Sequence, residues 1–335
     1  MITPEPPAPD ATPDVRLFFS TEKYRTCDYL LAVILTLCTA VGLPGNIITL
    51  LYFYSAKRKD FSSLMYTIVC GIDICTCIVH LPVMVGLYSG RRAGLFEKTI
   101  FCVAWSVVFY YLQRMSMFLV MLLSLSRSIK LIFLQYKIRK KYLIASFFLY
   151  TLYTAFWNVV VELFGGKNKY YAYSNIAGFC YYDIAEEPFS FIEQLVRTLT
   201  IGIPTTITTI SFIVFVIKLH ISQKNQVSRM NKKKYQAAVT MAIFTTLFLV
   251  CNLPCFLNNI LWFILKLLDE QPNKIYGNTF MFFYSWLISD IVCTVLNAAL
   301  NPVLYFYRIK HVREWSKSSV HSIRLSLKID SNPST

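Results

Sequence analysis

The amino-acid sequence predicts an all-α membrane protein: a seven-transmembrane helix bundle with a short amphipathic eighth helix. Seven apolar stretches fill most of the 335 residues. Hydrophobic residues make up 56% of the chain and charged residues only 15%, whereas a soluble domain is nearer a quarter charged. Basic residues also concentrate in alternate connecting segments, which is typical of a chain threaded through a membrane.

Each apolar stretch reaches the roughly 20 residues that a spanning helix needs. The predicted spans are Tyr29–Tyr54, Ser62–Tyr88, Thr99–Phe133, Tyr142–Phe164, Gln194–Leu219, Tyr235–Lys266 and Asn278–Tyr307. They divide the chain into an extracellular tail (1–28), a seven-transmembrane domain (29–307) and an amphipathic helix with a cytoplasmic tail (308–335). The first segment is Pro-rich and polar, so we expect no cleavable signal peptide. In the last segment Val312, Trp315 and Val320 recur at helical spacing and predict a short helix on the membrane surface.

The distribution of charge predicts the orientation of the chain. Of the 33 Lys and Arg residues, 21 lie in the tail, at Arg127 and in the loops after spans one, three and five, with Asp60, Glu314 and Asp330 as the acids there. The positive-inside rule therefore predicts that the N-terminus is outside and the C-terminus is in the cytoplasm. This topology accounts for the net charge of +15, so we expect membrane lipids as partners and no nucleic acid.

Three of the ten cysteines, Cys27, Cys102 and Cys180, lie near the outer face. They allow one disulfide bond with three possible pairings. Cys102 stands at the outer end of span three, because Arg127 follows it at roughly 37 Å along the helix. Cys180 could reach Cys102 and tie the loop before span five over the bundle. We predict this disulfide bond; the alternative is a free thiol in the loop.

Asp73 is a charged residue near the middle of span two, where a carboxylate needs polar partners. The candidates are Asn46 of span one, Ser116 of span three, and Asn297 and Asn301 of span seven. Oxygens from such groups suit Na⁺ or a cluster of water molecules. The alternative is an aspartate held by hydrogen bonds alone.

Three prolines, Pro204, Pro254 and Pro302, fall inside spans five, six and seven. Each one removes a helical hydrogen bond and frees a carbonyl group. A proline in a spanning helix is either a hinge or a tolerated kink.

These residues, in this order and spacing, resemble the rhodopsin-like (class A) G-protein-coupled receptors. The resemblance covers roughly 29–317. The matching residues are Gly45-Asn46, Asp73, Cys102, Arg127, Pro204, Cys251-Asn252-Leu253-Pro254, Asn297 and Asn301-Pro302-Val303-Leu304-Tyr305.

The resemblance implies a receptor that passes an extracellular signal, from a peptide or a small molecule, to a heterotrimeric G protein. Arrestin and a receptor kinase are further implied partners. It implies a sodium and water pocket of Asn46, Asp73, Ser116, Asn297 and Asn301. It also implies an inner switch of Arg127 and Tyr305, and an activation connector of Met117, Pro204, Phe248, Asn252, Pro254 and Pro302.

The chain departs from the family pattern at several of these positions. The family's Asp/Glu-Arg-Tyr reads Ser126-Arg127-Ser128 here, so no carboxylate stands beside Arg127. We therefore expect weaker locking of the resting state and raised basal signalling. Asn252 replaces the family's toggle tryptophan, and Phe212 replaces the span-five tyrosine.

The sequence indicates little about the ligand. Span three carries no aspartate, so the family's amine anchor is absent, and Phe109 and Tyr110 occupy that depth. Arg114 suits an anionic ligand group, or it pairs internally with Glu162, Glu193 or Asp290. The candidate ligand-pocket residues are Phe109, Tyr110, Arg114, Glu193, Arg197 and Asp290.

Two rival functions stay open beside the receptor. One is a seven-helix protein of the same fold that does not couple to G proteins, which Ser126-Arg127-Ser128 favours. The other is a transporter or channel, although the chain lacks an internal inverted repeat. An enzyme is not expected, since His80 is the only histidine within a span and no nucleophile–base set is present. We expect no cofactor beyond Na⁺ at Asp73.

Overall fold

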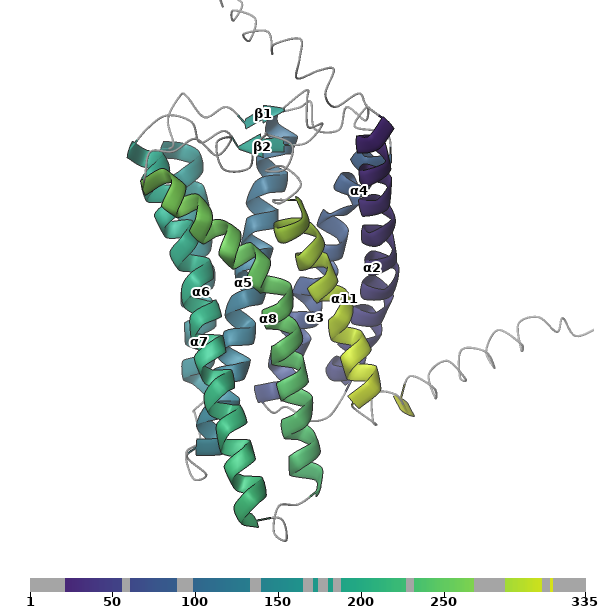
Figure 1. Ribbon diagram of the computed structural model, residues 1–335, viewed down its shortest axis with the longest axis vertical. Coiled ribbons are helices and arrows are strands. Elements are labelled where there is room, and N and C mark those ends of the chain that lie inside the picture. Colours follow the sequence, from purple (N-terminus) through teal and green to yellow (C-terminus); the bar gives the residue numbers. More distant parts are fainter. Residues whose placement is uncertain are drawn as a thin grey trace, which may run out of the picture.

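The computed structural model describes residues 22–55, 61–88, 99–132, 140–164, 171–173, 180–182, 188–226, 232–267, 287–308 and 314–315. Within them, seven helical segments run side by side as a bundle (Figure 1). Their elements are α2 (Glu22–Ser55), α3 (Phe61–Val79) with α4 (Leu81–Tyr88), α5 (Thr99–Ile132), α6 (Lys140–Phe164), α7 (Pro188–Gln226), α8 (Lys232–Leu267), and η2 (Leu287–Val292) with α11 (Cys293–Arg308). The predicted all-α bundle of seven segments is confirmed.

The second and seventh segments are each irregular at one point. In the second, a turn at His80 separates α3 from α4, and Pro82 follows where its missing N–H is tolerated in the first turn of α4. The seventh opens with the π-helical turn η2, which carries Asp290. Such turns rotate the side chains that follow, and they are frequent at functional sites.

The outer surface of the bundle is apolar, as a bilayer requires. Six of the described helices are long and apolar enough to cross a membrane, and α6 contributes a shorter apolar stretch, Ile144–Trp157. On α6 the side chains of Leu149, Leu152 and Phe156 are about two-thirds exposed. In water this surface would cost free energy, whereas in lipid it faces a solvent of its own kind.

Helix α5 is the central element, with 78% of its apolar stretch buried against 33% for α2. Two groups of buried side chains pack around it. We call the first the outer cluster; it includes Leu35, Leu87, Phe109, Ile291 and Val295. The second, the inner cluster, includes Met65, Met117, Phe215, Phe248 and Tyr305. The polar residues described below lie among these two clusters.

Two short strands and a helical turn complete the described part. Strands β1 (Tyr171–Tyr173) and β2 (Cys180–Tyr182) pair antiparallel, with Tyr173 opposite Cys180. Both contact α5, and Figure 1 shows them at the end of the bundle opposite the C-terminal end of α11. Glu314 and Trp315 are helical, which agrees with the expected short eighth helix. The ring of Trp315 lies 5.8 Å from that of Tyr52 on α2.

Candidate functional site

Asp73 lies on α3 in the middle of the bundle and is 1% exposed. The amide of Asn301 donates a hydrogen bond to its carboxylate at 2.7 Å, joining α11 to α3. Ser116 and Asn297 are also buried, but among the described residues neither forms a hydrogen bond with Asp73. A carboxylate can accept about four hydrogen bonds, so one amide leaves it capacity for water or a cation.

Asn46 forms hydrogen bonds to the backbone of two helices. Its side-chain N–H group donates to the carbonyl oxygens of Gly42 and Ala298, each at 2.9 Å. Ala298 precedes Pro302 by four residues, so its carbonyl is the one that the missing N–H of Pro302 leaves without a helical partner. Asn46 on α2 therefore satisfies the backbone of α11 at its proline.

Pro204 on α7 is matched in the same way. It frees the carbonyl of Thr200, and the hydroxyl of Tyr150 on α6 donates to that oxygen at 3.3 Å. The ring of Tyr150 also stacks on Phe118 of α5, with centroids 3.9 Å apart. Two of the three predicted hinge prolines thus have a polar side chain from a neighbouring helix at the carbonyl they free.

The connector residues meet in the inner cluster. Met117 and Phe248 are both buried there, beside Ile201 of α7. Asn252, which replaces the family's tryptophan, is 4% exposed and donates to the carbonyl of Phe248 on its own helix at 2.8 Å. Its polar group is therefore satisfied locally, and Asn252 does not supply the large ring that a tryptophan would.

The inner switch is only partly described, because the side chain of Arg127 lies outside the described residues. Tyr305 is 2% exposed, and the rings of Phe53, Tyr66 and Phe244 surround it at 5.2–6.2 Å. Its hydroxyl has no hydrogen-bond partner among the described residues. Aromatic packing therefore holds this tyrosine between α2, α3 and α8.

The two serines that flank Arg127 bond to backbone. Ser126 donates to the carbonyl of Leu123 on its own helix at 2.9 Å. Ser128 donates to the carbonyl of Ser211 at 2.8 Å and so ties α5 to α7. Neither position carries a charge that could hold an arginine.

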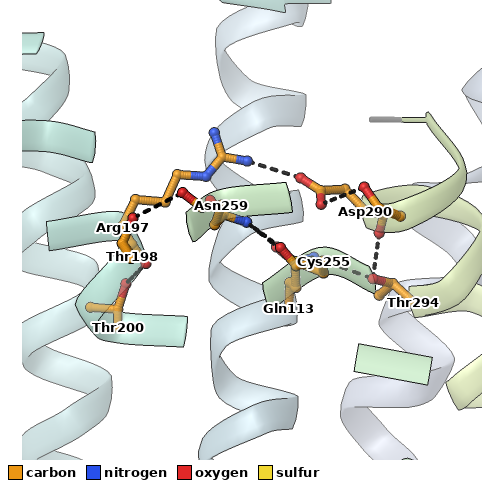
Figure 2. A network of polar contacts seen from close by, with 9 residues as sticks. Gln113, Arg197, Thr198, Thr200, Cys255, Asn259, Asp290 and Thr294 are labelled. Carbon is orange, nitrogen blue, oxygen red and sulfur yellow. Dashed lines mark hydrogen bonds and ion pairs between the residues drawn. The ribbon is translucent and has the colours of Figure 1, made fainter. Parts of the chain in front are cut away.

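The outer half of the bundle contains a second polar network, shown in Figure 2. Arg197 of α7 and Asp290 of η2 form an ion pair at 2.9 Å, and their side chains are 13% and 1% exposed. The guanidinium group of Arg197 also lies 4.2 Å from the ring centre of Tyr110 on α5, a cation–π contact. Three helices therefore meet at one arginine.

Side chains of four helices extend this network. Gln113 of α5 donates to Thr294 at 3.3 Å and to the sulfur of Cys255 at 3.4 Å. Thr294 in turn donates to the backbone of Asp290. Asn259 donates to the carbonyl of Cys255 at 2.8 Å, and Thr198 of α7 donates to that of Asn259 at 3.4 Å.

The remaining ligand-pocket candidates separate into different places. Asp290, which the sequence offered as a partner for Arg114, is the ion-pair partner of Arg197. Arg114 is buried on α5, with 5% of its surface exposed. Phe109 stacks on Trp105 in the outer cluster, so it belongs to the core. The side chain of Glu193 lies outside the described residues.

Sequence reasoning missed Gln113, Cys255, Asn259 and Thr294. Helical spacing could have found them, because Thr294 follows Asp290 by four residues and Asn259 follows Cys255 by four. Gln113 follows Tyr110 by three and therefore shares its face.

The described residues bear on the predicted disulfide bond only through Cys27 and strand β2. Cys27 is a free, half-buried thiol, packed against the outer cluster, so neither pairing with Cys27 is formed. The side chains of Cys102 and Cys180 lie outside the described residues. Strand β2, which begins at Cys180, contacts the helix that carries Cys102.

Comparison with known proteins agrees with this arrangement. The family model for the 7 transmembrane receptor (rhodopsin family) matches residues 45–305. Among solved structures, the crystal structure of squid rhodopsin superimposes with a TM-score of 0.68 at 14% identity, over 95% of this chain and 91% of that one. No curated protein sequence matches significantly. The match spans more than half of the chain, so the protein belongs to the rhodopsin family of seven-transmembrane receptors.

Proposed function

We propose that the chain transmits an extracellular signal, from a peptide or small molecule, across the plasma membrane to a heterotrimeric G protein. The observation that carries this proposal is the hydrogen bond from Asn301 to Asp73, next to Pro302. At this proline, α11 lacks one hydrogen bond of its backbone ladder, and side chains of α2 and α3 bond to it there. A helix held in this way can change its packing when those contacts change.

In the proposed mechanism, ligand binding at the outer half favours a second state of the bundle that exists before binding. Met117 and Phe248 repack in the inner cluster, and the cytoplasmic part of α8 moves outward. Phe244 then leaves the ring of Tyr305, against which it packs at 6.2 Å in this state. The opened inner face offers Arg127 and the basic loops to the G protein.

We extend the proposal to the other expected partners. Na⁺ binds the resting state at Asp73, with water completing its shell, since Asn301 is the one side chain in the described part of the chain that bonds to the carboxylate. Arrestin and a receptor kinase act on the cytoplasmic side, and membrane lipids contact the apolar surface. The N-terminus is outside and the C-terminus is inside, as the charge distribution favours.

Nucleotide exchange on purified G proteins tests this function without a known ligand. The full chain in lipid nanodiscs should accelerate exchange on at least one class of Gα subunit over empty nanodiscs. Arg127→Ala should reduce that acceleration, because the proposed contact with Gα is lost. Acceleration that is identical for both chains would remove Arg127 from the coupling surface.

A second candidate function is a seven-helix protein of this family that does not couple to G proteins. The uncharged Ser126 favours it, because its hydroxyl donates to the backbone of its own helix and supplies no negative charge beside Arg127. Exchange rates that match empty nanodiscs for every Gα class would favour this candidate.

A further inference from the structure

The Arg197–Asp290 ion pair lies deep in the bundle, with side chains that are 13% and 1% exposed. It bridges α7 and η2 across the centre of the outer half, where α5 and α8 also converge (Figure 2). Asp290 is fully buried, whereas Arg197 keeps part of its surface. Replacing a buried pair by apolar residues is often neutral or stabilising, so stability alone does not explain why charges stand here.

Two further observations at the pair point to a ligand. The first is η2, the π-helical turn that aims Asp290 into the bundle, because such turns recur at functional sites. The second is Gln113, whose side-chain oxygen is buried and has no hydrogen-bond partner among the described residues. Gln113 is 1% exposed, so its oxygen has no access to bulk water.

The orientation of the Gln113 amide follows from its neighbours. The hydroxyl of Thr294 donates its proton to the backbone of Asp290, so its oxygen can only accept. Gln113 must therefore turn its NH₂ group toward Thr294, as the 3.3 Å contact shows. Its oxygen is left as an acceptor within the same network as the Asp290 carboxylate.

The ion pair restricts the charge that a ligand can carry. A ligand with only a cation would take the carboxylate of Asp290 and bury a second positive charge beside the guanidinium of Arg197, and like charges repel. A ligand with only an anion would take Arg197 from Asp290 and leave that more deeply buried carboxylate without its cation. Removing one member of a buried pair is strongly unfavourable, because the other charge stays buried and unpaired. A ligand with both charges replaces one pair by two.

We propose that Arg197 and Asp290 are the anchor of a ligand whose ammonium and carboxylate groups lie close together, as in a free α-amino acid. The carboxylate binds the guanidinium of Arg197, which Tyr110 orients. The ammonium binds Asp290 and the oxygen of Gln113. The 2.9 Å between the two anchors requires neighbouring charges on the ligand, and the termini of a peptide stand further apart. This inference rests on the proposed receptor function.

The test is thermal unfolding of the full chain in lipid nanodiscs with each of the twenty common amino acids as the probe. At least one should raise the unfolding temperature, saturating with concentration. For that amino acid, the amide (a cation) and the N-acetyl derivative (an anion) should each bind roughly 10- to 100-fold more weakly, since each loses a charged hydrogen bond to a buried group. The one-residue-longer peptide should also bind more weakly.

Two variants test which protein groups bind the carboxylate and the ammonium of the ligand. The double variant Arg197→Gln/Asp290→Asn removes both charges without stranding either, so it keeps the fold and should lose the response to the amino acid. Gln113→Leu should weaken binding of the amino acid and its amide, but not of the N-acetyl derivative.

Three results would overturn the proposal: no amino acid shifts the native chain, the amide or N-acetyl form binds as tightly as the amino acid, or the double variant responds unchanged. Nucleotide exchange separates this from the receptor function. Binding without exchange on any Gα class supports the anchor and contradicts the coupling. Exchange without amino-acid binding does the reverse.

Discussion

At two of the prolines, a polar side chain of a neighbouring helix bonds to the carbonyl group that the proline frees. In a bilayer, a carbonyl that proline frees has no bulk water to bond, and a neighbouring helix can supply the donor. Asn46 does so for Pro302 and Tyr150 for Pro204. Each of these two prolines is therefore both a weak point of its own helix and a point of attachment to another.

Asn46→Ala should destabilise the protein by about 1–3 kcal/mol, because it leaves the carbonyl of Ala298 buried without a donor. Pro302→Ala restores the N–H group that this carbonyl lacks. It should therefore recover part of the loss in the Asn46→Ala background, and do less in the native chain. Unfolding in nanodiscs measures both changes. Equal effects of Pro302→Ala in the two backgrounds would contradict this pairing.

Asp73→Asn should abolish a stabilisation by Na⁺ that the native chain shows. At Na⁺ tenfold above its dissociation constant, binding to the folded state adds about 1.4 kcal/mol. The variant keeps an oxygen for the 2.7 Å bond from Asn301, so it should fold. Unfolding temperatures in NaCl and in choline chloride at equal ionic strength give the comparison. A sodium response that survives in Asp73→Asn would exclude this carboxylate as the site.

The sequence indicated which residues matter more readily than it indicated which residues they contact. The sequence offered four partners for Asp73, and among the described residues only Asn301 is bonded to it. The choice depends on how each helix is rotated, which hydropathy does not report. Arg197 and Asp290 were each candidates, but their pairing joins residues 93 positions apart through a π-helical turn that no sequence pattern predicted.

At the scale of elements, the spans were predicted closely because a run of apolar residues and a spanning helix coincide. Helix α5 (Thr99–Ile132) ends one residue before the predicted limit. Helix α7 (Pro188–Gln226) extends beyond the predicted span at both ends. Its C-terminal end carries polar residues such as Gln223 and Gln226, which lower hydropathy without opposing a helix. The described part of the seventh segment begins at Leu287, so its predicted start lies outside the description.

Gly45 sets the approach of α2 to α11, and Gly45→Ala should separate them. An added Cβ atom would lie 2.7 Å and 2.8 Å from two carbons of Pro302. Overpacking of this kind costs about 1–3 kcal/mol. Gly71→Ala is the matched control, because nothing lies within 4 Å of its added Cβ and alanine favours a helix by about 1 kcal/mol. Unfolding should show opposite signs for the two variants. A stabilised Gly45→Ala would contradict the close approach.

Cys102 and Cys180 should form the bond that holds strand β2 at α5. Peptide mapping by mass spectrometry without reduction should recover these two cysteines in one linked pair. Cys27→Ser should leave that pair intact, because Cys27 is a free thiol. Loss of the bond should destabilise the protein by about 2–4 kcal/mol. A linked peptide containing Cys27 would show that the pairing is wrong.

At the scale of the whole molecule, two polar networks lie along the bundle with apolar packing between them. The outer one centres on Arg197 and Asp290, and the inner one on Asp73 and Asn301. Met117 and Phe248 pack in the cluster beside them. A signal that starts at the outer network therefore has a contiguous set of packed side chains through which to reach Tyr305.

At the inner end of the molecule, the residues that flank Arg127 in the sequence are Ser126 and Ser128, and neither is acidic. Aromatic rings surround Tyr305, and Ser128 ties α5 to α7, but Ser126 serves only its own helix. A charge pair at this place would add to the free-energy gap between resting and active states. A gap smaller by about 1.4 kcal/mol raises the minor active population tenfold.

The rate of nucleotide exchange without ligand tests most directly whether the missing carboxylate beside Arg127 raises basal signalling. Membranes with matched surface expression of the native chain, Ser126→Asp and the uncharged control Ser126→Asn would be compared on the responsive Gα class. We predict measurable basal exchange from the native chain, a clear reduction in Ser126→Asp, and no comparable reduction in Ser126→Asn. Equal rates in all three would show that the missing carboxylate is irrelevant here, and no exchange from any of them would contradict coupling to a G protein.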